Sequence, residues 1–223
     1  MRSFIDGLDP SRLTDILMSV IPALICITIH EMSHGWVAYR LGDDTAKRMG
    51  RLTLNPIKHI DIVGLIMMAV FGFGWAKPVP IDMRSFKNPK RGMAITALAG
   101  PLSNILLAAV MLALLGISFA ISPTGGMVED LIYRTATLSV ALAVFNIIPI
   151  PPLDGSKVLF SFLSDKIYVK LMRVERFGFI ILAVLLYTNA LDSTIVVACN
   201  FILDRMLHIT RGVFLLATKL GGG

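Results

Sequence analysis

Long apolar stretches run through this sequence and are separated by short polar and basic segments. Four of these stretches, at residues 13–39, 93–121, 131–148 and 177–197, approach or exceed the roughly 20 apolar residues that cross a bilayer as a helix. Pro22 lies inside the first stretch and should kink that helix. The pattern therefore predicts a polytopic helical bundle that crosses a membrane.

The segments between these stretches do not follow a helical pattern. Residues 50–64, "GRLTLNPIKHIDIVG", mix β-branched residues with Gly, Asn and Pro, which predicts a short strand and a turn. Residues 62–75 are apolar but short, and the three prolines in residues 76–92 forbid a regular helix. The predicted fold class is an all-α membrane protein with a small β-hairpin or sheet.

The second half of the chain contains one more break. Residues 148–155, "IPIPPLDG", interrupt the apolar pattern, which resumes briefly through Phe162. The tail from Asn200 onward is more amphipathic than the stretches before it. The sequence shows no internal repeat, so we expect a single membrane-embedded domain over residues 1–223.

Composition agrees with a membrane protein. Hydrophobic residues make up 55% of the 223 residues and charged residues 16%, against roughly 25% charged in soluble domains. The mean hydropathy is +0.75. The net charge of +6 comes from Lys and Arg in the short connecting segments, which indicates membrane topology and not nucleic-acid binding.

Basic residues also predict an orientation. Basic side chains cluster in the segments around residues 40–58, 77–91 and 157–176, which should all be cytoplasmic, whereas the turn at residues 122–130 has none. If the first two basic segments share a side, the apolar piece between them cannot cross the membrane. We therefore predict that residues 61–75 form a re-entrant segment, buried in protein or lining a wet cavity.

Candidate chemistry lies inside the first apolar stretch, in "HEMSH". His30 and His34 are four residues apart, so on a helix both imidazoles face the same side and can share a metal ion. Zinc suits two neutral imidazoles and an oxygen ligand, and it lowers the pKa of a bound water toward about 7. Glu31 is then placed to take the proton. A chance HxxxH with hydrogen-bonded side chains is the alternative, but ionisable groups in a membrane segment are costly and indicate function.

A catalytic zinc site needs a third protein ligand at the same depth. Asp154 fits, because it lies between two apolar stretches where three prolines break the helix. It can also act as a helix N-cap, alone or together with ligation. His59 and His208 lie in polar, basic contexts, and Cys26, one turn before His30, is better explained as core filling.

The combination of HExxH in an apolar helix with a distant Asn-containing, Pro-rich segment ending in "LDG" resembles the site-2 protease family of intramembrane zinc metalloproteases. The segments "GRLTLNPIKHID", "GWAKPVP" and "AGPLSN" also look like its compact branch, which lacks PDZ and CBS domains. The resemblance implies that His30, His34 and Asp154 bind zinc and that Glu31 is the general base. By the same resemblance, Asn146 orients the substrate or stabilises the oxyanion.

Substrate binding can be predicted less directly. A substrate backbone must be unpaired before it is cut, and the predicted strand around Gly50, Leu52 and Leu54 can add the substrate as an edge strand. In "AGPLSN", Gly100 and Asn104 allow close helix packing, and the resemblance adds a direct substrate role as an alternative.

The leading hypothesis is therefore an intramembrane zinc endopeptidase in the cell membrane, with Zn2+ as cofactor and its site toward the cytoplasmic side. Its expected partners are the lipid bilayer and single-span membrane proteins or signal-peptide remnants as substrates, with homo-oligomerisation left open. A metal-ion or proton transporter using the same His and Asp cluster is the rival. Transport gives no reason for a glutamate beside the ligand, and the chain shows no repeated halves.

Overall fold

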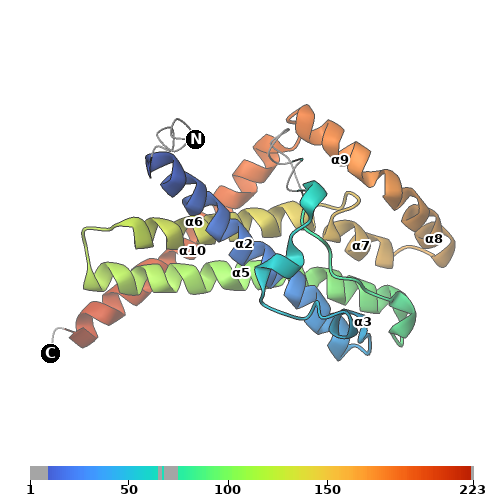
Figure 1. The fold of residues 1–223 in the computed structure, drawn as a ribbon, viewed down its shortest axis with the longest axis horizontal. Coiled ribbons are helices and arrows are strands. Elements are labelled where there is room, and N and C mark those ends of the chain that lie inside the picture. The colour runs from blue at the N-terminus through green and yellow to red at the C-terminus, as the bar shows by residue number, and fades with distance from the viewer. Residues whose placement is uncertain (1–9, 65–66, 68–74, 222–223) are drawn as a thin grey trace, which may run out of the picture.

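Four long helices dominate the computed structural model, which describes residues 10–64, 67 and 75–221 (Figure 1). They are α2 (Pro10–Arg40), α5 (Pro89–Ile121), α6 (Met127–Ile147) and α10 (Asp192–Gly221). Each contains a stretch long and apolar enough to cross a membrane. The prediction of a polytopic helical membrane protein is confirmed.

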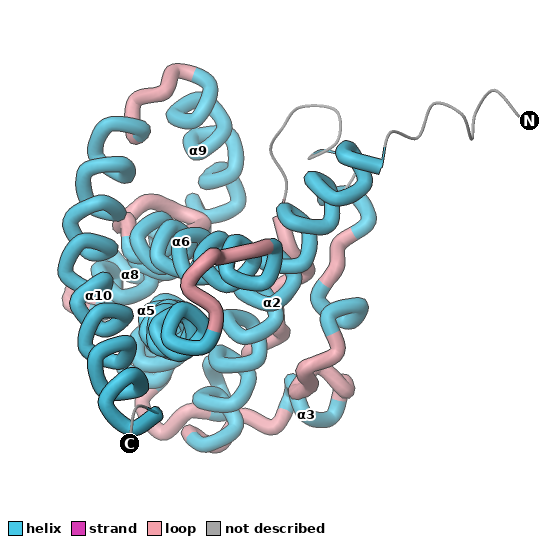
Figure 2. The backbone as a smooth tube through the Cα atoms, turned by 90° about the vertical axis from the view of Figure 1, so that its left-hand side faces the viewer, coloured by secondary structure: helices cyan, strands magenta, loops and turns pink. Residues whose placement is uncertain are grey.

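Helix α5 is the centre of the bundle. It packs against α6, α2 and α10, and the view along its axis shows α10 and α2 on opposite sides of the α5 and α6 pair (Figure 2). Between α5, α6 and α10 lies a core of small and branched apolar side chains, made of Ala108, Leu112, Leu115, Ala136, Val140, Val144 and Leu203. Helix α5 therefore contacts every other long helix and can carry residues that support a site on α2.

Local chemistry explains where α5 begins and how closely it packs. The side chain of Asn88 accepts a hydrogen bond from the backbone N–H of Arg91, and Pro89 occupies the first turn, where its missing N–H costs nothing. At Gly116, α10 comes so close that an added Cβ would lie 2.5 Å from the carbonyl oxygen of Thr210. Small residues allow such close approach between membrane helices.

After α6 the chain breaks at residues 148–153 and continues as α7 (Asp154–Ser161). The break brings Gly155 against the end of α6, because an added Cβ there would collide with the carbonyl oxygen of Ile147. The close approach of α7 to the end of α6 therefore requires a glycine at position 155. Short helices follow: α8 (Asp165–Val174), η3 (Glu175–Phe177) and α9 (Gly178–Tyr187).

The prediction of one long helix over residues 177–197 is wrong. Helix α9 ends at Tyr187, and Asn189 adopts a left-handed backbone conformation with φ 54°. Asn tolerates this conformation better than most residues, so the chain can turn here. The fourth long helix is instead α10, which contains the segment predicted to be an amphipathic tail.

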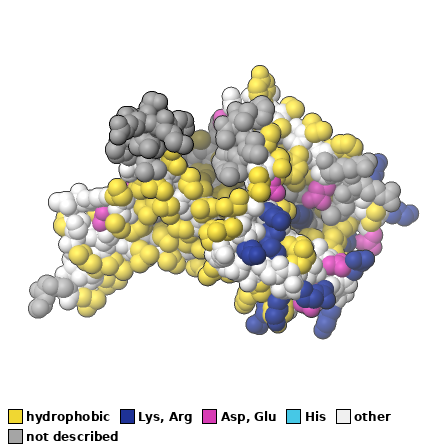
Figure 3. Space-filling model, in the orientation of Figure 1, with side chains coloured by type: hydrophobic (Ala, Val, Ile, Leu, Met, Phe, Trp, Pro, Cys, Tyr) yellow, Lys and Arg dark blue, Asp and Glu magenta, His cyan; other side chains and the backbone are white. Residues whose placement is uncertain are grey.

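The connection between α2 and α5 begins and ends at the same end of the bundle. It contains α3 (Thr45–Arg48), η1 (Pro56–His59) and η2 (Met83–Ser85). The buried carboxylate of Asp43 joins its two ends, since it accepts hydrogen bonds from the backbone N–H groups of Thr45 at 3.0 Å and Asp82 at 2.7 Å. The first two basic segments therefore share one side, where Lys and Arg gather at the right of Figure 3.

The predicted β-hairpin or sheet is wrong, because the described residues contain no strand. Local hydrogen bonds occupy the backbone that a strand would need: the Asn55 side chain accepts from the N–H of Ile57, and the His59 ring contacts the carbonyl oxygen of Thr53. Pro56 has no N–H to offer. One backbone bond, from the N–H of Lys77 to His59, connects this segment to the next. A sheet needs a continuous ladder of such bonds.

The re-entrant segment predicted over residues 61–75 falls mostly outside the described residues, since 65–66 and 68–74 are not among them. Its path through the membrane stays a prediction.

Asp43→Ala should destabilise the protein by about 2 kcal/mol, because two partly buried backbone donors lose a charged acceptor. Unfolding of the purified protein in mixed micelles measures the change. Asp44→Ala is the matched control, since the side chain of this neighbour is half exposed and forms a surface ion pair with Arg48. Equal stability of the two variants would contradict the structural role of Asp43.

Candidate metal centre

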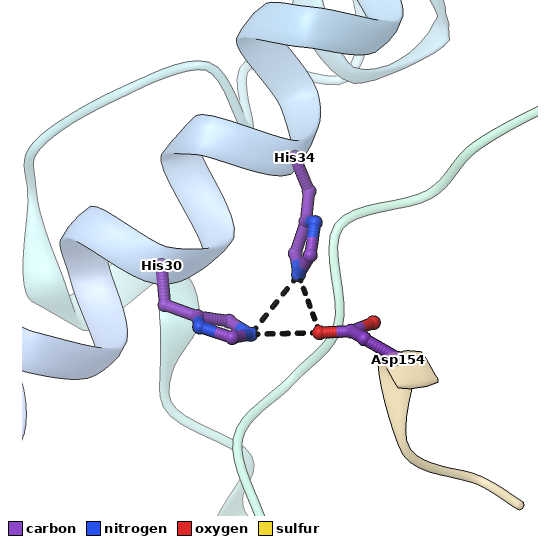
Figure 4. Close-up of side chains that lie close together, drawn as sticks. All are labelled: His30, His34 and Asp154. Atoms are coloured by element: carbon purple, nitrogen blue, oxygen red, sulfur yellow. Dashed lines mark hydrogen bonds and ion pairs between the residues drawn. The ribbon is translucent and has the colours of Figure 1, made fainter. Parts of the chain in front are cut away.

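Three side chains from two distant helices converge inside the bundle. His30 and His34 lie one turn apart on α2, and Asp154 is the first residue of α7. The Nε2 atoms of the two rings are 3.0 Å apart, and each lies 3.1 Å from Oδ2 of Asp154 (Figure 4). All three residues are buried, with exposed fractions of 6–7%. These are the three residues predicted to bind the metal.

The hydrogen bond between His34 and the Thr96 carbonyl determines which nitrogen of the His34 ring carries a hydrogen. Its Nδ1 lies 2.7 Å from the carbonyl oxygen of Thr96, which can only accept, so Nδ1 carries a hydrogen. In the neutral ring, Nε2 then presents a lone pair to His30 and Asp154. Lone pairs this close repel one another unless a positive charge lies between them.

The donor set and its spacing fit zinc. Tetrahedral zinc with bonds of about 2.0–2.2 Å holds its ligand atoms roughly 3.3 Å apart, close to the 3.0 and 3.1 Å found here. Burial opposes ionisation of Asp154, but without a metal ion a protonated His34 ring, hydrogen bonds from His30 and His34, and the Lys157 ammonium lower the pKa of its carboxyl. An ionised Asp154 carboxylate could therefore serve as a metal ligand in a largely apolar setting.

Gly100 of α5 lies directly against both histidine rings. An added Cβ would be 2.5 Å from Cε1 of His30 and from Nε2 of His34, closer than carbon and nitrogen atoms can approach without a bond. A glycine at this position gives the two imidazoles room to face Asp154. The direct substrate role suggested by the resemblance stays a prediction, and steric support of the ligands accounts for this residue.

One turn later on α5, Asn104 is fully buried, and its side-chain amide lies 3.2 Å from Nδ1 of His30. Its backbone carbonyl accepts a hydrogen bond from the Ser139 hydroxyl of α6 at 2.8 Å. A substrate contact by Asn104 also stays a prediction. In the structure the amide faces His30, on the side of the ring away from Asp154.

Glu31 lines the same cavity as the three ligands, a space of about 150 Å³. Its Oε2 accepts a hydrogen bond of 2.8 Å from the backbone N–H of Val79. Val79 lies between Pro78 and Pro80, and proline has no backbone N–H. Of these three residues, only Val79 can therefore donate a backbone hydrogen bond to Glu31. Sequence analysis identified Glu31 but missed the Val79 N–H as its partner. The only signal was the pattern "KPVPI", in which Val79 is flanked by two prolines.

Asn146 and Lys157 also line this cavity. The Asn146 amide donates to the carbonyl oxygen of Leu142 in its own helix at 3.0 Å. The Lys157 ammonium lies 3.4 Å from Oδ1 of Asp154, the oxygen that does not face the histidines. Sequence analysis missed Lys157, although its position three residues after Asp154 places both on one face of a helix.

Of the residues predicted to pair with a substrate strand, none lies in a strand. Gly50 occupies a turn with φ 63°, Leu54 is 63% exposed, and Leu52 packs toward Gly35 on α2. Edge-strand addition at these positions therefore loses its structural basis. Cys26 is fully buried, and its thiol donates to the carbonyl oxygen of Thr135, in agreement with a role in the core.

The apolar helices, the HExxH pair and the nearby Asp154 carboxylate are the features of a membrane-embedded zinc metallopeptidase. The family model of peptidase family M50 matches residues 18–124 and 120–188. These matches cover more than half of the chain, and the chain belongs to peptidase family M50.

Relatives support the same activity. The chain is 36% identical over 201 residues to "Putative zinc metalloprotease YwhC" of Bacillus subtilis, covering 87% of this chain and 91% of that protein. It is 31% identical over 194 residues to "Putative zinc metalloprotease Rip2" of Mycolicibacterium smegmatis, covering 84% and 73%. No solved structure matches the chain significantly. These findings favour a zinc peptidase over a metal-ion transporter.

Replacing Gly100 by Ala should lower zinc affinity roughly 10-fold or more, because the added methyl displaces both imidazoles. Competition with a coloured zinc chelator, using purified protein in detergent, measures the affinity. Gly212→Ala is the control, since a Cβ at that position meets nothing within 4 Å. Unchanged zinc affinity in the Gly100 variant would contradict the steric role.

Proposed function

We propose that this protein is an intramembrane endopeptidase that hydrolyses peptide bonds in or near the transmembrane segments of other proteins. The observation that carries the proposal is the convergence of His30, His34 and Asp154 within an apolar bundle, with Glu31 in the same cavity. Three of these four residues, His30, Glu31 and His34, lie on α2, which is apolar enough to cross the membrane. A peptidase site there meets substrates that reside in the bilayer.

In the proposed reaction, His30, His34 and Asp154 hold the metal ion. When bound, zinc acts as a Lewis acid toward the scissile carbonyl group and lowers the pKa of water toward about 7. Glu31 takes a proton from the attacking water and passes it to the leaving amine. Its hydrogen bond to the Val79 N–H fixes the carboxylate at the cavity wall.

Two further side chains have proposed roles in the same cavity. Asn146 can donate its amide to the developing oxyanion once it exchanges its bond to the Leu142 carbonyl for the substrate. Lys157 holds Oδ1 of Asp154, which leaves Oδ2 facing the histidines. The first residue acts on the substrate, and the second positions a ligand.

The substrate must be locally unwound. Every backbone group of a membrane helix is engaged in a hydrogen bond, and a general base cannot reach a peptide bond within such a helix. The cavity of about 150 Å³ is far smaller than a helix and can admit only an extended stretch of chain. Single-span proteins and signal-peptide remnants, which unwind near their ends, are the proposed substrates.

The proposed location is the cell membrane, with the site nearer the cytoplasmic face. The supporting observation is the gathering of basic residues at the end of the bundle where α2 ends and α5 begins (Figure 3). His34 lies less than two turns before Arg40, the last residue of α2. The site is therefore close to this basic end.

Glu31→Gln should bind zinc normally and cleave about 10²- to 10⁴-fold more slowly, because the amide keeps the shape of the side chain but cannot accept the proton. Cleavage of a single-span reporter in proteoliposomes measures the rate, and metal analysis measures the zinc. Chelation should abolish wild-type cleavage, and added zinc should restore it.

Asp154→Asn provides the contrast, since it should lose zinc and cleavage together. If Glu31→Gln cleaved at the wild-type rate, the proposed role of Glu31 would be overturned. If wild-type protein loaded with zinc cut no membrane-spanning reporter but cut a soluble peptide, the intramembrane substrate class would fall.

Single cysteines introduced at Lys87 and Thr124 test the orientation in a background that lacks Cys26 and Cys199. Both positions are exposed and lie at opposite ends of the bundle. A membrane-impermeant thiol reagent added to intact cells should label the Thr124 position and spare the Lys87 position until the cells are opened. The reverse pattern would place the site on the outer side.

A further inference from the structure

The two histidines of the centre need the same protonation pattern. Each presents Nε2 toward Oδ2 of Asp154, so each must carry its hydrogen on Nδ1 to leave Nε2 free for a metal ion. For His34 the Thr96 carbonyl enforces this pattern, because a carbonyl can only accept. His30 has no backbone carbonyl in the equivalent place, and its Nδ1 faces the side chain of Asn104 at 3.2 Å.

Asn104 can face His30 in two orientations. A primary amide is nearly symmetric in shape, so rotation by half a turn exchanges its oxygen and nitrogen without moving other atoms. With the NH2 group toward His30, Nδ1 would have to accept, the hydrogen would sit on Nε2, and zinc could not bind there. In that orientation Oδ1 is also buried without a hydrogen-bond partner. The orientation compatible with zinc places Oδ1 against Nδ1.

Helix α5 holds this amide in a fixed place. Asn104 is fully buried, and the Ser139 hydroxyl of α6 binds its backbone carbonyl. Gly100 and Asn104 are four residues apart, so they occupy one face of α5. Gly100 leaves space for the His30 ring, and the Asn104 amide contacts Nδ1 on the side of the ring opposite Asp154.

We propose that Asn104 is a positioning residue, which accepts a hydrogen bond from Nδ1 of His30 and so holds this imidazole in its zinc-binding form. The inference rests on the proposed ligand set of His30, His34 and Asp154. Outer partners of this kind orient metal-binding histidines and raise their basicity. Asn104 thereby has the same task for His30 that the Thr96 carbonyl has for His34.

Zinc affinity of the full-length protein in detergent tests the proposal through two variants of similar size. Asn104→Leu removes the acceptor and should weaken zinc binding about 10- to 100-fold. Asn104→Asp has only acceptor oxygens and should keep the affinity within about 3-fold of wild type. Thr210→Ala is the matched control, because it removes a hydroxyl that donates to another backbone carbonyl of α5, that of Leu112, two turns beyond Asn104.

A spectroscopic measurement distinguishes this role from simple packing. Nitrogen NMR of isotope-labelled histidine in the zinc-loaded protein should show His30 protonated on Nδ1, with slow exchange of that hydrogen in wild type and Asn104→Asp. Exchange should be faster in Asn104→Leu. The chain has only four histidines, so the signals can be assigned by substituting His59 and His208.

The proposal is overturned if His30 in the wild type is protonated on Nε2, if Asn104→Leu keeps wild-type zinc affinity, or if Asn104→Asp loses as much affinity as Asn104→Leu. His30→Ala separates this from failure of the ligand set. If His30→Ala loses zinc while Asn104→Leu keeps it, only the role of Asn104 falls. If His30→Ala keeps zinc, the ligand assignment falls as well.

Discussion

Two imidazole nitrogens and a carboxylate oxygen are held 3.0 and 3.1 Å apart in the interior of an apolar bundle. In surroundings of low polarizability, such a cluster of lone pairs is unstable without a cation, and with one it is bound tightly. Much of the described structure keeps these three atoms together. Helix α2 supplies two of them, the start of α7 supplies the third, and α5 lies behind the rings.

The central helix illustrates how a membrane fold serves its site. From a single face, α5 offers the Thr96 carbonyl to His34, the amide of Asn104 to His30, and the space at Gly100 to both rings. The other faces of α5 pack against α6 and α10. Without a hydrophobic driving force between helices in lipid, close packing and polar contacts of this kind supply the specificity. The metal centre and the bundle therefore stabilise each other.

The irregular segment between α2 and α5 also supports the site. The chain between α2 and α5 returns to its starting end, where Asp43 joins its two ends through backbone hydrogen bonds. Its proline-rich part passes the cavity and offers the Val79 N–H to Glu31. Non-helical backbone can line a cavity where its polar groups find partners. Here that backbone holds the proposed general base in place.

Sequence alone determined the features that depend on local spacing and hydrophobicity: a bundle of membrane helices, the shared face of His30 and His34, and the candidacy of Asp154. It failed where local hydrogen bonds and turns override the pattern of apolar and β-branched residues. The strand at residues 50–54 was wrong because the N–H groups of Gly50 and Arg51 bond to α3 and the His59 ring contacts the carbonyl of Thr53. The helix at 177–197 was wrong because the chain turns at Asn189. Only the tertiary structure could decide that Asn104 lies against His30, because that contact joins residues 74 positions apart on different helices.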